Sequence, residues 1–294
     1  MVKIIQAVWL LIIADIYIYA KVDLNDPAVR KNIISQAVEV LPKKQADGTF
    51  LYYQPLAVSP YKGTGWIKVY YDDGRKIHTL SQIKDGIDEG FETTWYENGQ
   101  KMSEGKCKDG KKDGMRTTWF KNGQKESEKF YAQNEKKGTC RHWFSNGNLK
   151  IIHHHHPESG KIYGLLRRWH ENGQIMEESN WKDGKEDGLA NIWYENGQKE
   201  AEVNVKDGKL QRAKKWKPNG EVCPITNVKD GNGVIVVYNL DGTEKERFTY
   251  RDGVTIETKE ESNSQTDDVI PSDELDKILK NSIGESAQAL PPPP

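Results

Sequence analysis

The sequence predicts an all-β protein, an elongated single-layer antiparallel meander of about eight stacked β-hairpin repeats, with a short N-terminal capping helix and a disordered C-terminal tail. Three observations predict this class. The 10% aromatic content is too high for a wholly disordered chain, whereas a mean hydropathy of −0.82 is too polar for a thick core. A glycine–aromatic–glycine pattern recurs along the chain, and turn dipeptides separate its units.

Each repeat has a glycine, four residues, an aromatic residue, three residues and a second glycine, as in Gly90–Gly99. Eight units follow one another 22 to 26 residues apart, and one has Gln211 in place of its first glycine. Equivalent strands then lie about 9–10 Å apart, so their rings form one row on one face. We expect this row to be structural, with an aromatic platform for carbohydrate or peptide as the alternative. Its members are Tyr70, Trp95, Trp119, Trp143, Trp169, Trp193, Trp216 and Tyr238.

Tight turns separate the strands of each repeat. Asn-Gly dipeptides such as Asn98-Gly99 alternate with Asp-Gly dipeptides such as Asp183-Gly184. These residues tolerate the positive φ that two-residue hairpin turns require. A turn every 11 to 13 residues leaves strands of about eight residues, which is too short for capped helices. The repeats are predicted to occupy residues 63–256.

A second aromatic row follows the first, one residue later in most units. Neighbouring residues of a strand point to opposite faces, so this row lies on the other side of the sheet. It loses its aromatic character at some units, as expected of a surface that is free to vary. We therefore predict that a partner binds the face with Tyr71, Tyr96, Phe120, Phe144 and Tyr194.

The N-terminal residues 1–20 have the features of an export signal. Lys3 precedes the apolar run Ile4–Ile13, and Ala20 occupies a suitable position before a cleavage site. The protein is therefore expected to be exported, to the periplasm, the cell surface or the medium, unless this segment stays uncleaved as a membrane anchor. Residues 21–62 are predicted to form a lead-in segment with a helix over Asp26–Val40, in which Pro27 suits the first turn.

The C-terminal residues 257–294 form an acidic tail with a net charge of −6, which leaves +5 on residues 1–256. The tail is rich in Ser, Asp and Glu and ends in four prolines, so it is expected to be disordered. Within it, Leu275, Ile278, Leu279 and Ile283 have the spacing of a short amphipathic helix. The overall charge of −1 argues against a dedicated nucleic-acid-binding protein.

Few residues indicate chemistry. The three cysteines show no metal-ligand spacing, so they are predicted to be bystander thiols. In an extended strand His153 and His155 would share a face and could hold a metal, but a zinc site needs three or four ligands. We expect an exposed strand or bulge at His153–His156. No phosphate loop or nucleophile motif is present. The sequence therefore predicts no catalytic residue, no cofactor and no metal.

The repeat units resemble a known family. Trp95-Tyr-Glu-Asn-Gly-Gln100 and Trp193-Tyr-Glu-Asn-Gly-Gln198, joined by linkers such as Lys108–Gly114, are similar to the bacterial variant of the MORN repeat. The resemblance implies an elongated twisted sheet of stacked hairpins, and many bacterial members are described as antitoxin-like. The chain departs from the pattern at Gln211, at Asn134 and around His153–His156, where we expect the sheet to bend or bulge.

These observations predict a non-enzymatic protein that acts as a protein-binding or scaffold module through its extended sheet. One alternative is an antitoxin-like inhibitor that neutralises a toxic enzyme. Another is an envelope- or carbohydrate-binding module. The expected partner is a second protein, with an envelope glycan or anionic lipid as further candidates for the basic turns.

Overall fold

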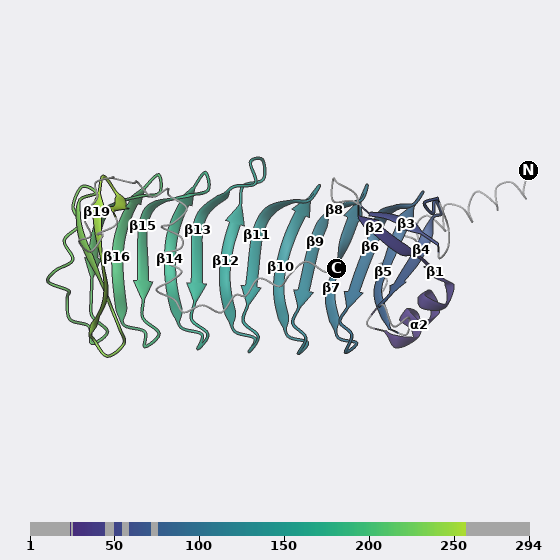
Figure 1. Cartoon of the computed structure of the whole chain (residues 1–294), viewed down its shortest axis with the longest axis horizontal. Helices are drawn as coiled ribbons and strands as arrows, with labels where there is room; N and C mark the ends of the chain where they lie inside the picture. The colour runs from purple at the N-terminus through teal and green to yellow at the C-terminus, as the bar shows by residue number, and fades with distance from the viewer. Residues whose placement is uncertain (1–23, 25, 45–49, 55–58, 72–75, 257–294) are drawn as a thin grey trace, which may run out of the picture. The chain divides into compact units, whose positions relative to one another are not determined.

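The computed structural model describes residue 24 and residues 26–44, 50–54, 59–71 and 76–256 (Figure 1). The predicted export signal and the predicted tail helix lie outside the described residues. The chain divides into two compact units, Met1–Lys111 and Lys112–Pro294, so the predicted repeat region spans both.

The first unit contains the helix and the first repeats. Its elements are α2 (Pro27–Gln36), β1 (Val38–Glu39), β2 (Leu41–Lys44), β3 (Phe50–Tyr53), β4 (Gly65–Tyr70), β5 (Ile77–Lys84), β6 (Ile87–Trp95) and β7 (Lys101–Lys108), and β8 (Lys111–Lys112) lies at the unit boundary. Strands β4 to β7 form an antiparallel meander, and β1 pairs with β4 in parallel. Strands β2 and β3 form a separate hairpin.

Helix α2 is shorter than predicted. Asp26 caps it by accepting hydrogen bonds from the backbone N–H groups of Ala28 and Val29, at 2.7 and 3.3 Å. Its end at Gln36, rather than Val40, has a structural cause, because Val38 and Glu39 leave the helix to pair with the edge strand β4. The strand edge is thus covered by β1, which removes unpaired backbone groups there.

Both faces of the first unit's sheet are covered. On one face, Ile33 and Ile34 of α2 pack against a buried cluster that includes Leu80 and Trp95. On the other face, Tyr52 of β3 packs with Ile67, Val69 and Ile83. The Tyr52 hydroxyl donates to the buried Asp88 carboxylate at 2.8 Å.

The second unit continues the hairpin plan. Its strands are β9 (Gly114–Trp119), β10 (Lys125–Ala132), β11 (Glu135–Trp143), β12 (Leu149–His155), β13 (Ile162–Trp169), β14 (Ile175–Lys182), β15 (Lys185–Trp193), β16 (Lys199–Lys206), β17 (Lys209–Lys215), β18 (Gly233–Tyr238), β19 (Glu244–Arg251) and β20 (Val254–Ile256). Strands β9 to β17 pair in sequence order, each antiparallel to the next. The predicted fold class, an antiparallel meander with one short helix, is confirmed.

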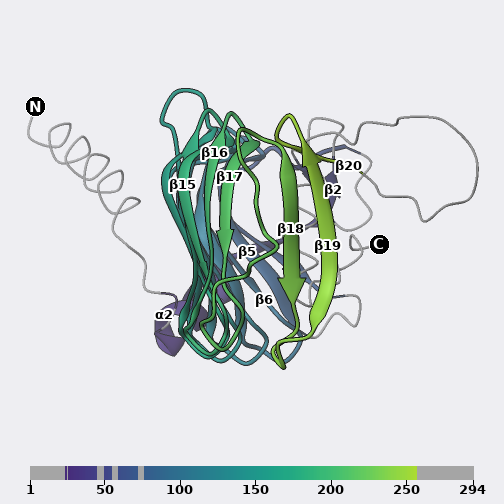
Figure 2. The same cartoon turned by 90° about the vertical axis from the view of Figure 1, so that its left-hand side faces the viewer.

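The last repeat departs from the plan. Strands β18 to β20 form their own three-stranded sheet instead of pairing with β17. The usual turn is kept, with the Lys217 N–H donating to the Glu221 carbonyl at 2.7 Å and a bridge between Trp216 and Val222. After this bridge the chain leaves the strand ladder and returns over one face of β16 and β17. There Val205 and Leu210 share a buried cluster with Val228 and Tyr250. Figure 2 shows β18 and β19 lying alongside β15–β17.

The Asp-Gly turns have the predicted conformation, whereas in the Asn-Gly turns only the glycine has a positive φ, as at Gly99 with 82°. Asp183 and Gly184 adopt φ values of 51° and 83°, the pair of positive angles that defines a type I′ hairpin turn. Gln133 and Asn134 occupy the equivalent turn with φ values of 52° and 71°, which explains how this repeat manages without Asp-Gly. In the Asn-Gly turns the asparagine has a second role, since the Asn196 side-chain amide donates to the Pro218 carbonyl of the next repeat at 3.0 Å.

Candidate functional site

The predicted aromatic row makes contacts between successive repeats. In the second unit it defines a tryptophan face, which carries Trp119, Trp143, Trp169, Trp193 and Trp216, all half-buried. The strand partner of each tryptophan on this face is a lysine in some repeats and an aliphatic residue in others, such as Leu149 beside Trp143. Lys125 is the strand partner of Trp119, and its Nζ lies 5.2 Å from the Trp143 ring centroid. Lys199 similarly lies 5.3 Å from the Trp216 centroid.

At the ends of the row the surroundings differ. Trp95 in the first unit is buried, with 6% of its surface exposed. Tyr70 lies in β4, where the Lys68 Nζ is 6.0 Å from its ring centroid. Tyr238 is buried in β18, and its hydroxyl lies 3.0 Å from the Cys223 Sγ. Burial raises the pKa of Tyr238 to about 12, so its phenol is neutral near pH 7.

The second aromatic row is divided between the two units. Tyr71 and Tyr96 lie in the first unit, and Phe120, Phe144 and Tyr194 in the second. The Tyr71 hydroxyl donates to the Trp95 carbonyl at 2.5 Å, and the Tyr194 hydroxyl donates to the Trp216 carbonyl at 2.8 Å.

At the equivalent place in another repeat, the His170 Nε2 lies 2.8 Å from the Trp193 carbonyl oxygen. In these three repeats a polar ring atom therefore connects the repeat to the backbone of the next one. The sequence signal for this role is the recurrence of Tyr and His, both potential donors, directly after the tryptophan.

The other members of the row are half-buried. Tyr96 and Phe120 follow the strands β6 and β9, and Phe144 follows β11, with the Lys150 Nζ 5.3 Å from its ring centroid. Of the five predicted binding residues, only Tyr194 lines the cleft described next.

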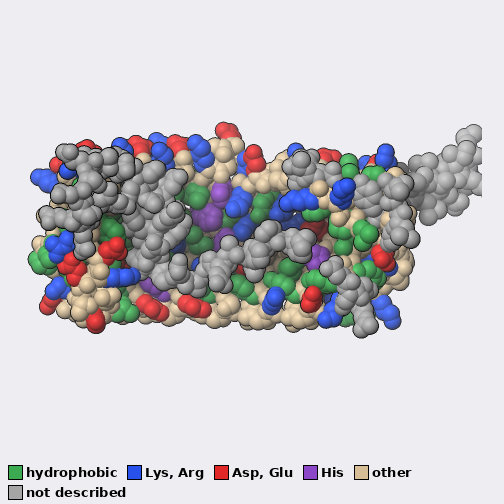
Figure 3. Space-filling model, viewed as in Figure 1, with side chains coloured by type: hydrophobic (Ala, Val, Ile, Leu, Met, Phe, Trp, Pro, Cys, Tyr) green, Lys and Arg blue, Asp and Glu red, His purple; other side chains and the backbone are tan. Residues whose placement is uncertain are grey.

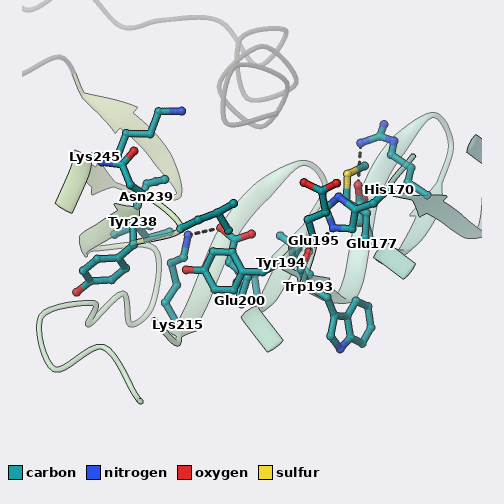
Figure 4. A pocket seen from close by; sticks show the side chains of 18 of the residues that line it. His170, Glu177, Trp193, Tyr194, Glu195, Glu200, Lys215, Tyr238, Asn239 and Lys245 are labelled. Atoms are coloured by element: carbon teal, nitrogen blue, oxygen red, sulfur yellow. Dashed lines mark hydrogen bonds and ion pairs between the residues drawn. The ribbon is translucent and has the colours of Figure 1, made fainter. Parts of the chain in front are cut away.

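A cleft of about 350 Å³ lies between the sheet face opposite the tryptophans and the C-terminal sheet. Ile192, Ala201 and Val203 line it from β15 and β16, and Ile235 and Phe248 line it from β18 and β19. It exists because the chain returns over this face after β17. Figure 4 shows Tyr194 and Tyr238 among the side chains of the cleft, with the Trp193 ring directed away from Tyr194.

The charged groups inside the cleft are paired. Lys215 is 5% exposed, and its Nζ lies 2.8 Å from the Glu200 carboxylate (Figure 4). Arg168 forms the second ion pair, with Glu177 at 2.7 Å. Pairing offsets the cost of burying these charges. Glu195, Asn239, Leu240 and Lys245 add exposed polar and apolar groups to the lining.

Two polar rings of the cleft are already hydrogen-bonded within the protein. The described lining of the cleft includes no serine, threonine or cysteine that could act as a nucleophile beside a base. Its histidine, His170, is engaged with the Trp193 carbonyl. Burial raises the pKa of Tyr194, which keeps its phenol neutral as a hydrogen-bond donor.

The histidine run lies in β12 and has surroundings that the sequence did not indicate. His153 is only 9% exposed, so the prediction of a solvent-exposed strand is wrong at this residue. The pairing of β12 with β13 shifts register between Ile152 and His154, but β10 with β11 and β14 with β15 shift in the same way, so this shift belongs to the regular repeat and the expected bend stays a prediction. Cys140 of β11 lies directly opposite His153, a neighbour that sequence spacing alone did not reveal.

Burial lowers the pKa of His153 to about 3 and that of the adjacent His142 to about 4. Burial also raises the pKa of the Cys140 thiol, although Lys136 and Lys129 oppose this change. Both rings are therefore neutral near pH 7. Among the described residues, Cys140, His153 and His155 form a group of side chains that could hold a metal ion.

Comparison with known families gives one match. Residues 158–183 and 186–207 match the MORN repeat variant, over segments that run from the turn before β13 through β16. No curated protein matches the chain. In the described part of the chain, no helix has the length and apolar character needed to cross a membrane.

Proposed function

We propose that this protein is a non-enzymatic repeat scaffold that binds a segment of another protein in the cleft between β14–β17 and β18–β19. The observation that carries the proposal is the lining of this cleft, which combines apolar and aromatic side chains with a few fixed polar groups. Sites of this composition bind ligands by burying their apolar parts and orienting them through polar contacts.

The geometry favours a peptide segment over a small charged metabolite. The interior charges of Lys215 and Arg168 are already paired with Glu200 and Glu177, so no unbalanced charge is available there for an ionic ligand. Ile235, Val237 and Phe248 of the lining are instead half-buried and Leu240 is exposed, so apolar surface is available there to a partner. Aromatic and apolar side chains are typical anchors at protein interfaces. The match to a repeat family is consistent with a scaffold role.

Photo-crosslinking tests the location of the partner. A photoreactive amino acid at Leu240, which lines the cleft and is 63% exposed, should capture a discrete protein from an extract of the native source. The matched control is Leu189 of β15, which is 44% exposed and is absent from the cleft lining. Equal capture at both positions would contradict the proposal. Adducts confined to glycan or lipid would favour an envelope-binding module, and inhibition of a captured enzyme would favour an antitoxin-like inhibitor.

We further propose that the protein acts outside the cytoplasm. The support is the sequence of residues 1–20, in which Lys3 precedes an apolar run that ends before Ala20. Mass spectrometry of the native protein should give a mature N-terminus at or near Lys21. An intact N-terminus on a membrane-associated protein would support the uncleaved anchor instead.

A further inference from the structure

Strands β11 and β12 place three metal-binding side chains on one face of the second unit's sheet. Cys140 pairs with His153 across the two strands, and His155 pairs with Gly138. His153 and His155 are two residues apart, so both point to the face that carries Cys140. Gly138 has no side chain, and its surroundings are open, which leaves room beside the His155 ring. Figure 3 shows histidine side chains grouped in the region of β12.

The distances suit a small tetrahedral metal ion. The Cys140 Sγ and one ligand nitrogen from each of His153 and His155 lie within 4.8 Å of one another. The Nε2 atoms of the two histidines are 3.2 Å apart. A tetrahedral zinc ion with Zn–N bonds of about 2.0–2.1 Å holds two such nitrogens about 3.3–3.4 Å apart. The two rings therefore need little movement to share one ion.

The His155 ring is already oriented for this role. Its Nδ1 lies 2.6 Å from the carbonyl oxygen of Gly160, which fixes the proton on Nδ1 and leaves Nε2 unprotonated, facing the His153 Nε2 at 3.2 Å. Metal-binding histidines are commonly held by such a second hydrogen bond. The Gly160 carbonyl belongs to the longer loop between β12 and β13, where the repeat spacing rises to 26 residues. The insertion thus supplies the group that orients the ring.

His153 provides an independent observation. Its side chain is more than nine-tenths buried, and its Nδ1 has no hydrogen-bond partner. A buried polar atom of this kind needs a structural explanation. The ring also stacks on His142, with centroids 6.0 Å apart. An ion bound between the two Nε2 atoms replaces their 3.2 Å hydrogen bond, and the proton of the His153 ring then moves to the unpartnered Nδ1.

We propose that Cys140, His153 and His155 bind one zinc ion. The thiol loses its proton to solvent as Sγ binds the metal, and the fourth position is left to water or to the nearby His142. A thiolate with two imidazoles selects a borderline-soft transition metal and excludes Mg²⁺ and Ca²⁺, which take oxygen ligands. The ion would join β11 to β12 where the regular repeat is interrupted.

The experiment uses the full chain without a polyhistidine tag. Equilibrium dialysis with metal analysis should give one Zn²⁺ per chain. Replacement by Co²⁺ should give a thiolate-to-cobalt charge-transfer band with the strong visible bands of a tetrahedral ion. The variants Cys140→Ser and His155→Asn should weaken Zn²⁺ binding by at least about tenfold, since each removes a ligand.

Neighbouring residues supply the controls. His154 and His156 belong to the same histidine run, but neither is part of the Cys140 cluster, and His154 instead contacts Thr139 at 2.9 Å. The variants His154→Asn, His156→Asn and Cys107→Ser should therefore bind Zn²⁺ as the unaltered chain does. Circular dichroism checks that each variant folds.

Two results would overturn the proposal. The first is a folded, unaltered chain that binds Co²⁺ without the charge-transfer band, because the thiolate would then not be a ligand. This readout does not depend on any variant folding. The second is equal weakening by His154→Asn and His155→Asn, which would show adventitious chelation by the histidine run.

Discussion

Two hairpins of the second unit, β11–β12 and β15–β16, share one backbone plan and carry different chemistry. Gly138 pairs with His155 in the first as Gly188 pairs with Val205 in the second. The next pair on the same face is Cys140 with His153 in the first hairpin and Ala190 with Val203 in the second. Both hairpins have a register shift directly before their tryptophan. The backbone pairing, the turn and the tryptophan are thus the same in both hairpins. The residues on the face opposite the tryptophans differ, and they form a cysteine–histidine cluster in one hairpin and a packing surface in the other.

Exchanging one residue between the two hairpins should have the largest effect on the free energy of unfolding. Val205 is 2% exposed in the cluster that holds β18–β20 on the sheet. We expect Val205→His to lower the free energy of unfolding by about 2–4 kcal/mol, because a larger polar ring enters an apolar cluster. The reciprocal change His155→Val should alter it by less than about 1 kcal/mol. Urea unfolding measures both, and equal costs would show that the two faces have the same structural role.

A change at the residue after the tryptophan should have a smaller effect on the free energy of unfolding. Tyr194 follows Trp193 and donates to the Trp216 carbonyl, whereas Phe144 follows Trp143 and has no hydroxyl. Tyr194→Phe should cost about 1–2 kcal/mol in unfolding free energy, because the carbonyl loses a partner. Tyr163→Phe, at a 40% exposed ring, is the control and should be nearly neutral. A neutral Tyr194→Phe would show that this hydrogen bond does not couple the repeats.

The lysines of the tryptophan face should have a weaker effect. Lys199 is the strand partner of Trp193, and Leu149 is the equivalent partner of Trp143. Lys199→Leu removes the cation from the Trp216 ring and should cost about 0.5–1 kcal/mol in unfolding free energy. High salt should leave most of this cost unchanged if the ring contact dominates, but should abolish it if the ion pair with Glu202 dominates.

The smallest expected effect is a gain at the turn before β11. Gln133 adopts a φ of 52°, which asparagine tolerates better than glutamine. Gln133→Asn should therefore raise the free energy of unfolding by about 0.5 kcal/mol. The reverse test is Asp183→Gln in the equivalent turn before β15, which should lower it by a similar amount. Thermal unfolding of the two variants, monitored side by side, should give midpoints shifted in opposite directions.

The hairpin plan was predictable from sequence because its determinants are local. Turn dipeptides such as Asp183-Gly184 report backbone conformation directly, and the spacing of Trp143 and Trp193 reports the repeat length. The separate sheet of β18–β20 was not predicted. Val234 to Tyr238 has an ordinary strand pattern, and only Pro224, after the turn of the preceding repeat, indicates a break.

The candidate sites were less predictable because they depend on register. Cys140 and His153 are 13 residues apart, and their alignment depends on the loop after Phe144 and on the shift before Trp143. The predicted binding role of Tyr71 and Tyr194 stays a prediction, and their hydroxyls are already hydrogen-bonded within the protein. Sequence indicated which residues share a face. It did not indicate which side chains would contact the neighbouring repeat.

The hydrogen bonds from Asn196 and Tyr194 to the following repeat both end on backbone carbonyl groups. Every amino acid supplies that acceptor, so these two contacts do not depend on which side chains the next repeat carries. Exchanging or duplicating a repeat therefore preserves them. The gene can lengthen or diversify its product one hairpin at a time, and each new copy is free to acquire its own ligand.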